Sequence, residues 1–130
     1  MSRTAATGPA NSSTAATAPA TVIPEPRLRE EDWQRRVTDL ADLRGWMWLH
    51  LRPARTTKGW RTPISGPLGA GWPDLILARG PRLLAVELKS ERGRVTPAQR
   101  TVLDTLALIP GVETLIARPA DWDRVQQVLA

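Results

Sequence analysis

Two apolar segments joined by a Gly-Pro turn constrain the fold of this 130-residue chain more than any other feature. Residues 74–78 and 83–89 are rich in Leu, Ile, Val and Ala, and the turn between them spans residues 79–82. Their length and composition predict two antiparallel strands joined as a hairpin. Because apolar residues occupy consecutive positions in both strands, we expect the hairpin to lie in a central sheet that helices cover on both faces.

The rest of the chain beyond the N-terminal segment shows helical and strand periodicities. In chain order these predict a helix over residues 30–44, a strand over 46–51, the two hairpin strands, a helix over 96–108, a strand over 112–117 and a helix over 121–129. Residues 52–71 are rich in Arg, Thr, Pro and Gly and are predicted to form a long loop. The order α-β-β-β-α-β-α indicates an α/β domain with a mixed four-stranded sheet flanked by helices.

The N-terminal segment differs from the rest in composition. Residues 1–26 are mainly Ala, Thr, Ser and Pro, so they cannot bury enough apolar surface to offset chain entropy. We therefore expect a disordered tail over residues 1–26 and one folded domain over residues 27–130. No apolar run approaches the roughly 18 residues of a membrane span, so we expect a cytoplasmic protein without membrane association.

The rare residue types exclude several kinds of functional site. The chain has no Cys and a single His, His50, which excludes a disulfide framework, a cysteine-based zinc site, a thiol nucleophile and a His-based metal cluster. Lys and Arg total 18 against 13 acids, and the net charge of +5 favours nucleic acid as a partner. We expect no organic cofactor. The glycine-rich residues 66–71 lack the Lys-Ser/Thr ending of a P-loop, and we interpret them as a close-approach turn that delivers Asp74.

Two acids and a lysine interrupt the central strands. If Ala78 pairs with Leu83, Asp74 lies opposite Glu87, and side chains directly opposite are about 5 Å apart on one face of a sheet. Lys89 follows Glu87 by two residues and so shares that face. The sequence therefore predicts an Asp-Glu-Lys cluster at one end of the sheet.

Such a cluster suits a metal-dependent hydrolase. Hard divalent cations such as Mg²⁺ take carboxylate oxygens together with substrate phosphate and water, and a nearby ammonium stabilises the charge that develops during hydrolysis. The alternative is a structural salt bridge between Lys89 and Glu87 or Asp74. We favour the metal site because buried ion pairs are poor stabilisers, and because Lys89 is one of only two lysines in a chain that otherwise uses Arg.

The two strands also carry a recognisable motif. Residues 71–75 read Gly-Trp-Pro-Asp-Leu and residues 86–90 read Val-Glu-Leu-Lys-Ser, and together they resemble the PD-(D/E)XK nuclease signature. Gly93 and Gln99 follow in the order typical of the VRR-NUC (virus-type replication-repair nuclease) domain, and the similarity covers about residues 29–129.

The resemblance implies a small restriction-endonuclease-like fold and metal-dependent hydrolysis of DNA phosphodiesters. It implies that Asp74, Glu87 and the backbone carbonyl of Leu88 bind Mg²⁺ or Mn²⁺, and that Lys89 assists the attacking water or the transition state. Family members occur as stand-alone phage and bacterial proteins and as domains of repair nucleases. A role in DNA replication, recombination or repair is therefore expected.

Glu30 is a further candidate for this site. On a helical wheel it lies within about 20° of Val37 and Ala41, which places it on the apolar side of the first helix. The resemblance implies that Glu30 completes the metal site. The alternative is an acidic helix N-terminus that suits the macrodipole, which explains the neighbouring Glu31 and Asp32 well.

Gln99 also has two interpretations. It follows Thr96 with the spacing of a capping box. It also shares a helical face with Val102 and Leu103, so it points toward the sheet. The resemblance implies that it helps to position water or Lys89, and both roles can hold at once.

Basic side chains gather in two segments next to the predicted site. Residues 52–61 contain four cations, one aromatic and no acid, and residues 92–94 extend the basic edge beyond Lys89. We predict that both segments bind phosphates and that Trp60 stacks on a base; a solvated basic loop is the alternative. The predicted DNA-binding residues are Arg52, Arg55, Lys58, Trp60, Arg61, Arg92 and Arg94. His50 is open between a hydrogen-bonded surface residue and a role on phosphate.

A structure-selective DNA endonuclease acting on junctions or flaps fits these features best, with Asp74, Glu87, Lys89, Gln99 and Glu30 as catalytic residues. The rival hypothesis is a non-catalytic DNA-binding accessory protein with a nuclease-like fold, whose acids only pair with Lys89. DNA is the expected partner. A homodimer is also expected, on the softer ground that cutting two strands is simplest with two sites.

Overall fold

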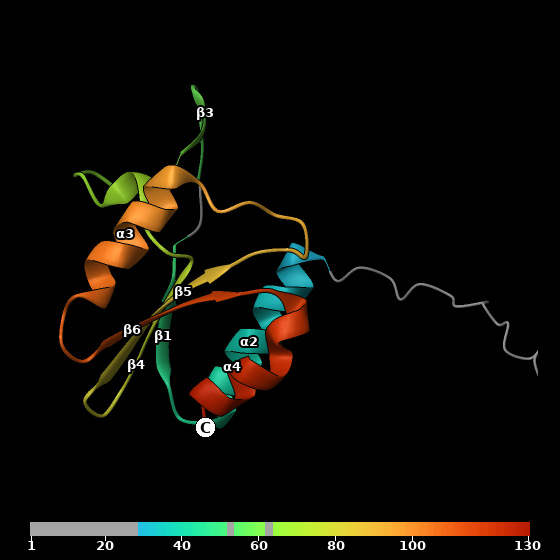
Figure 1. The fold of residues 1–130 in the computed structure, drawn as a ribbon. Coiled ribbons are helices and arrows are strands. Elements are labelled where there is room, and N and C mark those ends of the chain that lie inside the picture. The colour runs from blue at the N-terminus through green and yellow to red at the C-terminus, as the bar shows by residue number, and fades with distance from the viewer. Residues whose placement is uncertain (1–28, 52–53, 62–63) are drawn as a thin grey trace, which may run out of the picture.

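The computed structural model describes residues 29–51, 54–61 and 64–130 (Figure 1). The tail predicted over residues 1–26 lies outside the described residues. The main elements are α2 (Glu30–Leu43), β1 (Met47–His50), β4 (Leu75–Arg79), β5 (Arg82–Leu88), α3 (Pro97–Ala107), β6 (Val112–Ala117) and α4 (Trp122–Val128). Between β1 and β4 lie β2 (Ala54–Thr56), β3 (Gly59–Arg61) and the 3₁₀ turn η1 (Gly69–Gly71), and η2 (Pro119–Asp121) precedes α4.

The central sheet is mixed and has four strands in the order β1-β4-β5-β6. β4 runs antiparallel to β1 and β5, whereas β5 and β6 are parallel. Ala78 pairs with Leu83, which confirms the predicted register of the hairpin. The turn is tighter than predicted, because Arg79 and Arg82 also pair and Gly80 adopts a left-handed φ of 57°.

Helices cover both faces of the sheet, as predicted. Figure 1 shows α2 and α4 on one face and α3 on the other. On the α2 side Trp33 is 1% exposed, and its indole Nε1 donates to the carbonyl of Ala117 over 3.1 Å. On the α3 side Val102 and Leu106 pack on Ala85. The two hairpin strands alternate between these cores, since Leu75 and Val86 belong to the first core and Ala85 to the second.

The predicted long loop over residues 52–71 is wrong in part. It contains the β2–β3 hairpin, which stands away from the sheet in Figure 1, and η1. Thr56 pairs with Gly59, and a glycine with a φ of 102° closes the turn at that position. The hairpin was missed because its strands are three residues long and polar, so they lack the apolar alternation that marks a half-buried strand.

Helix and strand ends differ from prediction by at most one residue. α2 stops just before Gly45, which has a left-handed φ of 78°. The first predicted strand is shorter because Trp46 turns into the core and is only 3% exposed.

No helix within the described ranges is sufficiently long and apolar to cross a membrane.

Candidate active site

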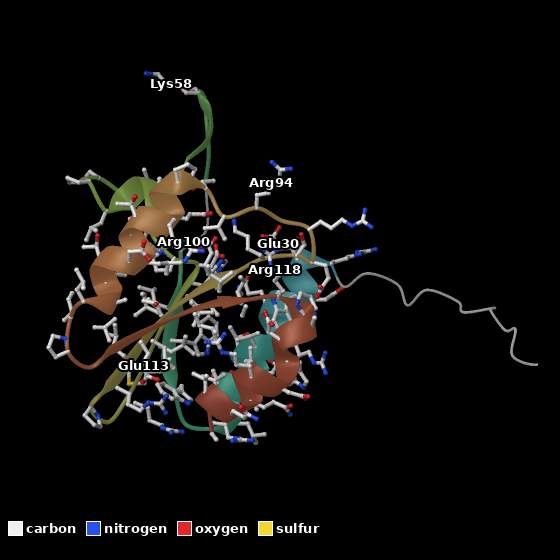
Figure 2. All side chains as sticks on the ribbon, viewed as in Figure 1. Glu30, Lys58, Arg94, Arg100, Glu113 and Arg118 are labelled. Atoms are coloured by element: carbon white, nitrogen blue, oxygen red, sulfur yellow. The ribbon has the colours of Figure 1, made fainter. Side chains whose placement is uncertain are left out.

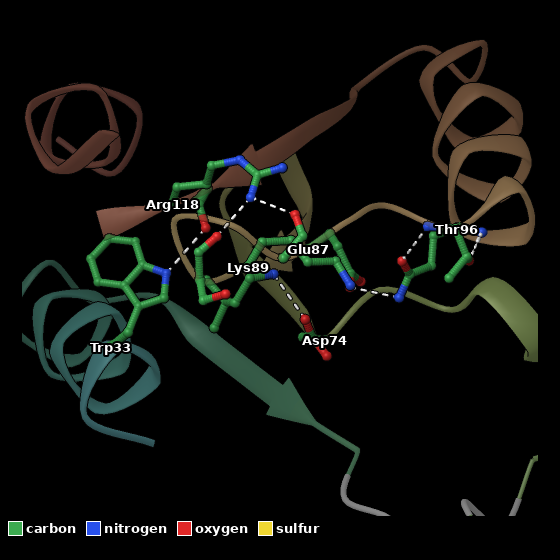
Figure 3. Close-up of polar contacts among 11 residues, drawn as sticks. Trp33, Asp74, Glu87, Lys89, Thr96 and Arg118 are labelled. Carbon is green, nitrogen blue, oxygen red and sulfur yellow. Dashed lines mark hydrogen bonds and ion pairs between the residues drawn. The ribbon is translucent and has the colours of Figure 1, made fainter. Parts of the chain in front are cut away.

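Glu87 lies at the centre of the site, near the end of β5 and only 1% exposed. Its Oε2 accepts two hydrogen bonds, from Lys89 Nζ over 3.1 Å and from Gln99 Nε2 over 2.8 Å (Figure 3). Its Oε1 is buried and has no hydrogen-bond partner within the part of the chain that the structure describes. The carboxylate is thus anchored through Oε2, while Oε1 is buried without such an anchor.

Asp74 lies one residue before β4 and beside Glu87. The hairpin pairs Leu75 with Val86, so one further step along the ladder brings Asp74 opposite Glu87. The carboxylate of Asp74 accepts a hydrogen bond of 2.8 Å from the backbone N–H of Leu88 through Oδ2. The predicted cluster of Asp74, Glu87 and Lys89 is therefore present in the structure.

The environment of Glu87 opposes its negative charge. Burial is the main cause and the charge of Asp74 the second, and together they raise the pKa of Glu87 to about 7 in the metal-free protein, against the lowering effect of Lys89. A structural salt bridge would need only Glu87 and Lys89. The second carboxylate, that of Asp74, adds a negative charge that a single lysine does not balance. This destabilises a simple salt bridge and favours the binding of a cation.

The residues present fit a hard divalent cation. A buried carboxylate oxygen of Glu87 without a partner, the adjacent carboxylate of Asp74 and nearby backbone carbonyls are all oxygen ligands, which Mg²⁺ and Mn²⁺ prefer. Among the described residues, no group of three or more His, Cys, Asp or Glu side chains could hold a metal ion. The protein therefore offers two carboxylates, a number typical of Mg²⁺ sites that are completed by substrate phosphate and water.

Gln99 forms the predicted capping box and, on the side that faces the sheet, contacts Glu87, a partner that the sequence did not predict. Its backbone N–H donates to Thr96 Oγ1 over 3.1 Å, and its side-chain Oε1 accepts from the backbone N–H of Thr96 over 2.9 Å, which together form a capping box. The same amide donates to Glu87 through Nε2. Gln99 therefore ties the N-terminus of α3 to the buried acid.

The glycine-rich segment before Asp74 is a close-approach turn. A Cβ at Gly71 would overlap the backbone carbonyl of Ala98 and lie 2.8 Å from the backbone nitrogen of Gln99. Only glycine lets η1 pack this closely on the first turn of α3. Gly71 therefore fixes the distance between the segment that carries Asp74 and the helix that carries Gln99.

A cleft of about 660 Å³ opens beside Asp74. Asp74 and Leu88 line it, and across it lie side chains from α2 and the end of β1, namely Glu30, Glu31, Gln34 and His50. Gln34 Nε2 and His50 Nδ1 are 3.0 Å apart, so the imidazole is part of a polar pair in this cleft. His50 thus lines the candidate site. The sequence alone had left open whether this single histidine lies at the site or elsewhere on the surface.

Glu30 is in the cleft but does not complete a three-acid cluster. It is exposed, and so is Glu31, which lines the same cleft although the helical wheel pointed it elsewhere. α2 begins at Glu30, so both acids belong to its first turn, and the cleft lies at this end of the helix, with Arg29 and Gln34 among its other lining residues. The role of Glu30 as a metal ligand stays a prediction.

The predicted DNA-binding residues are only partly described. Figure 2 shows Lys58 at the tip of the β2–β3 hairpin and Arg94 on the loop before α3, and both are exposed. Arg92 is exposed on the same loop. Arg52 lies outside the described residues, as do the side chains of Arg55, Trp60 and Arg61, whose backbones lie in β2 and β3.

One residue near the site was not anticipated from the sequence. Arg118, directly after β6, donates to backbone carbonyls of the segment that follows Lys89. Nothing distinguishes it among the many arginines of the chain, and only the parallel pairing of β5 with β6 shows that its strand ends beside Lys89.

Comparison with known proteins gives one family match. Residues 50–117 match the model of the VRR-NUC domain family, which is more than half of the chain and includes Asp74, Glu87, Lys89 and Gln99. The match begins after α2, so it does not include Glu30. A solved structure described as a "VRR_NUC domain protein" is 25% identical, covers 80% of this chain and 87% of its own, and has a TM-score of 0.47. No curated protein matches the chain significantly.

Proposed function

The chain belongs to the VRR-NUC domain family, a family of nuclease type, and from this membership we propose that it hydrolyses DNA phosphodiester bonds with the help of a divalent metal ion. The observation that carries the proposal is the state of Glu87. Its buried Oε1 has no partner among the described residues and lies beside a second carboxylate, that of Asp74. A divalent cation between these two carboxylates and the substrate phosphate would relieve the repulsion among their negative charges.

Asp74 and Glu87 would hold Mg²⁺ or Mn²⁺, together with the backbone carbonyl of Leu88. Glu30, on the far wall of the cleft and outside this cluster in the structure, would be a further ligand only if it moved toward the two acids. The bound ion would supply Lewis acidity and lower the pKa of a water molecule. The hydrogen bond from the Leu88 N–H turns one oxygen of Asp74 toward β5. The protein thereby orients both acids before any ligand arrives, which reduces the reorganisation that binding requires.

Lys89 and Gln99 have complementary parts in this proposal. Lys89 is largely buried, with 17% of its side chain exposed, so its ammonium acts in a poorly solvated site where charge interactions are strong. Lys89 would orient the attacking water or stabilise the charge that develops on the phosphate. Gln99 holds Oε2 of Glu87, which leaves Oε1 directed to the metal.

The basic segments would hold the DNA across this site. Lys58, Arg92 and Arg94 are exposed, and we assign them, with Arg52, Arg55, Trp60 and Arg61, to contacts with phosphates and bases. The assignment is supported by the position of Lys58 on a hairpin that stands away from the sheet and of Arg94 on the loop that leads from Lys89 to α3 (Figure 2).

The finer proposal is a structure-selective endonuclease that acts on junctions or flaps during DNA replication, recombination or repair in a bacterial or phage-infected cell. A homodimer would supply two sites for two strands. Its support is the edge strand β1, which pairs only with β4 in the sheet and exposes Met47 (80%) and Leu49 (54%). Sedimentation or light scattering of the purified protein would show one copy if this part is wrong.

The rival is a DNA-binding protein without catalysis. The two hypotheses separate when the purified protein is incubated with linear, flap, splayed-arm and four-way-junction DNA in Mg²⁺, Mn²⁺ or EDTA. The enzyme hypothesis expects metal-dependent cleavage that Glu87→Gln or Lys89→Ala abolishes while DNA binding persists. If the wild type cuts none of these substrates, and the variants bind DNA as it does, the rival is correct.

A further inference from the structure

The segment that follows Lys89 is held by one arginine from another strand. Nη1 of Arg118 lies 2.6 Å from the carbonyl oxygen of Ser90 and 2.7 Å from that of Gly93, with the carbonyl of Glu91 at 3.4 Å (Figure 3). A guanidinium is permanently charged and its planar donors suit such convergent acceptors. Arg118 therefore closes the turn at residues 90–93 around its own side chain.

The end of β6, directly before Arg118, also holds the backbone of Lys89. The N–H of Lys89 donates to the carbonyl of Ala117 over 3.0 Å, and the next residue is Arg118. Ala117 is completely buried and its carbonyl also accepts from Trp33, so this end of β6 is fixed to the core. The backbone of Lys89 and the turn after it are thus both attached to one rigid position.

The turn passes close to the side chain of Lys89. A Cβ at Gly93 would lie 3.4 Å from Cδ of Lys89 and 3.0 Å from Oγ of Ser90, so Gly93 lies next to the lysine stem. The turn has little packing of its own, because Ser90, Glu91 and Arg92 are exposed. The turn is also attached to the segment after β6 by a hydrogen bond of 2.6 Å from the Ala120 N–H to Glu91 Oε1.

We propose that Arg118 is a positioning residue, which fixes the 90–93 turn against the side chain of Lys89 and so holds the ammonium beside Glu87. It acts through Lys89 and does not touch the reacting atoms. Arg118 lies one residue beyond the region that the family model matches, so membership of the family does not assign it. The consequence for catalysis rests on the proposed nuclease function, whereas the consequence for Lys89 does not.

The chain offers an unusually clean spectroscopic test, since Lys58 and Lys89 are its only lysines. Protein grown with isotope-labelled lysine (carbon-13 at Cε) gives signals from these two residues alone. Arg118→Ala should move the Lys89 Cε signal and make its two Hε protons more nearly equivalent, because the stem is no longer held. The signal of Lys58, at the distant hairpin tip, is the internal control, and Arg124→Ala, an exposed arginine on α4, is the matched variant.

Activity and rescue complete the test. With cleavage measured under single-turnover conditions at saturating protein, so that a weaker hold of the turn on DNA does not enter the rate, Arg118→Ala should lower the rate by about 10- to 100-fold, as expected when a reacting group is misplaced. Added guanidinium should restore part of the rate and the Lys89 signal. A wild type without nuclease activity would contradict the proposed function and leave the Lys89 signals as the deciding readout.

Two results would overturn the role of Arg118. One is an unchanged Lys89 signal in a folded Arg118→Ala variant. The other is global unfolding of both Arg118→Ala and Arg118→Met, since methionine keeps the aliphatic stem and removes only the donors. In that case the arginine would be needed for general stability and not for the position of Lys89.

Discussion

Gln99 donates a hydrogen bond of 2.8 Å to the buried carboxylate of Glu87, and this contact joins the first turn of α3 to the end of β5. Both ends of the amide are engaged, because its oxygen accepts from the backbone N–H of Thr96. A residue that looks like an ordinary helix cap in the sequence is therefore also the partner that occupies one oxygen of Glu87 and leaves the other without a partner among the described residues.

The two roles of Gln99 can be separated with neighbouring variants. Thr96→Ala removes the cap but keeps the contact to Glu87, so it should cost about 1 kcal/mol in the free energy of unfolding and change the cleavage rate little. Gln99→Ala removes both, and should lower the single-turnover rate by about tenfold or more, because a buried acid loses a donor that orients it. Equal rates in the two variants would show that Gln99 acts only as a cap.

Gly71 should tolerate no side chain. In Gly71→Ala the new methyl group overlaps the carbonyl of Ala98, so η1 and α3 must move apart. We expect a loss of about 1–3 kcal/mol in the free energy of unfolding, as for overpacking in a core, together with slower cleavage, because Asp74 and Gln99 move relative to one another. Denaturant unfolding measures the first effect, and a fully stable, fully active variant would contradict the close-approach role.

The stability of the metal-free protein should depend on Glu87 in one pH window. Burial and the charge of Asp74 raise its pKa from 4.5 to about 7, against Lys89 beside it, so the folded state holds the proton more tightly than the unfolded state does. The stabilisation is complete below about pH 4.5 and is lost as the pH rises through about 7. Each unit of this shift corresponds to about 1.4 kcal/mol.

Glu87→Gln removes this titration. In EDTA, its melting temperature relative to the wild type should rise between about pH 4.5 and pH 7 and level off above that range. Adding Mn²⁺ at pH 8 should stabilise the wild type and leave Glu87→Gln nearly unchanged, because only the wild type keeps both carboxylates. A constant difference between the two proteins across the whole range would show that folding does not raise the pKa of Glu87.

The exposed cations should contribute to the salt dependence of the DNA dissociation constant. Removing one phosphate contact lowers the slope of log Kd against log salt by about 1. We expect this change for Lys58→Ala and for Arg94→Ala, and no change for Arg124→Ala on α4. Fluorescence anisotropy at several salt concentrations measures the slopes, and identical slopes in all three variants would remove these residues from the DNA-binding surface.

The hairpin and its acids could be predicted because each step rests on local rules. Apolar runs, a Gly-Pro turn and strand alternation fix which residues face one another, so the placement of Asp74 opposite Glu87 follows from counting. The capping box at Thr96 is equally local. These features need no knowledge of how distant elements pack.

The parts that escaped prediction depend on tertiary packing. The β2–β3 hairpin is too short and polar to show a periodicity. Arg118 acquires its contacts only because β6 pairs in parallel with β5, which places the two strand ends together. Glu30 and Glu31 line the same cleft at the first turn of α2, a placement that a helical wheel cannot show.

The most direct test of a metal-dependent nuclease centred on Glu87 is the single-turnover rate of junction or flap cleavage in Mg²⁺, compared between the wild type and Glu87→Gln at equal DNA occupancy. We predict measurable cleavage by the wild type that stops in EDTA, and a loss of about a thousandfold or more in the variant, because the metal loses a buried ligand that nothing else replaces. Equal rates in the two proteins, or wild-type cleavage that persists in EDTA, would contradict the assignment.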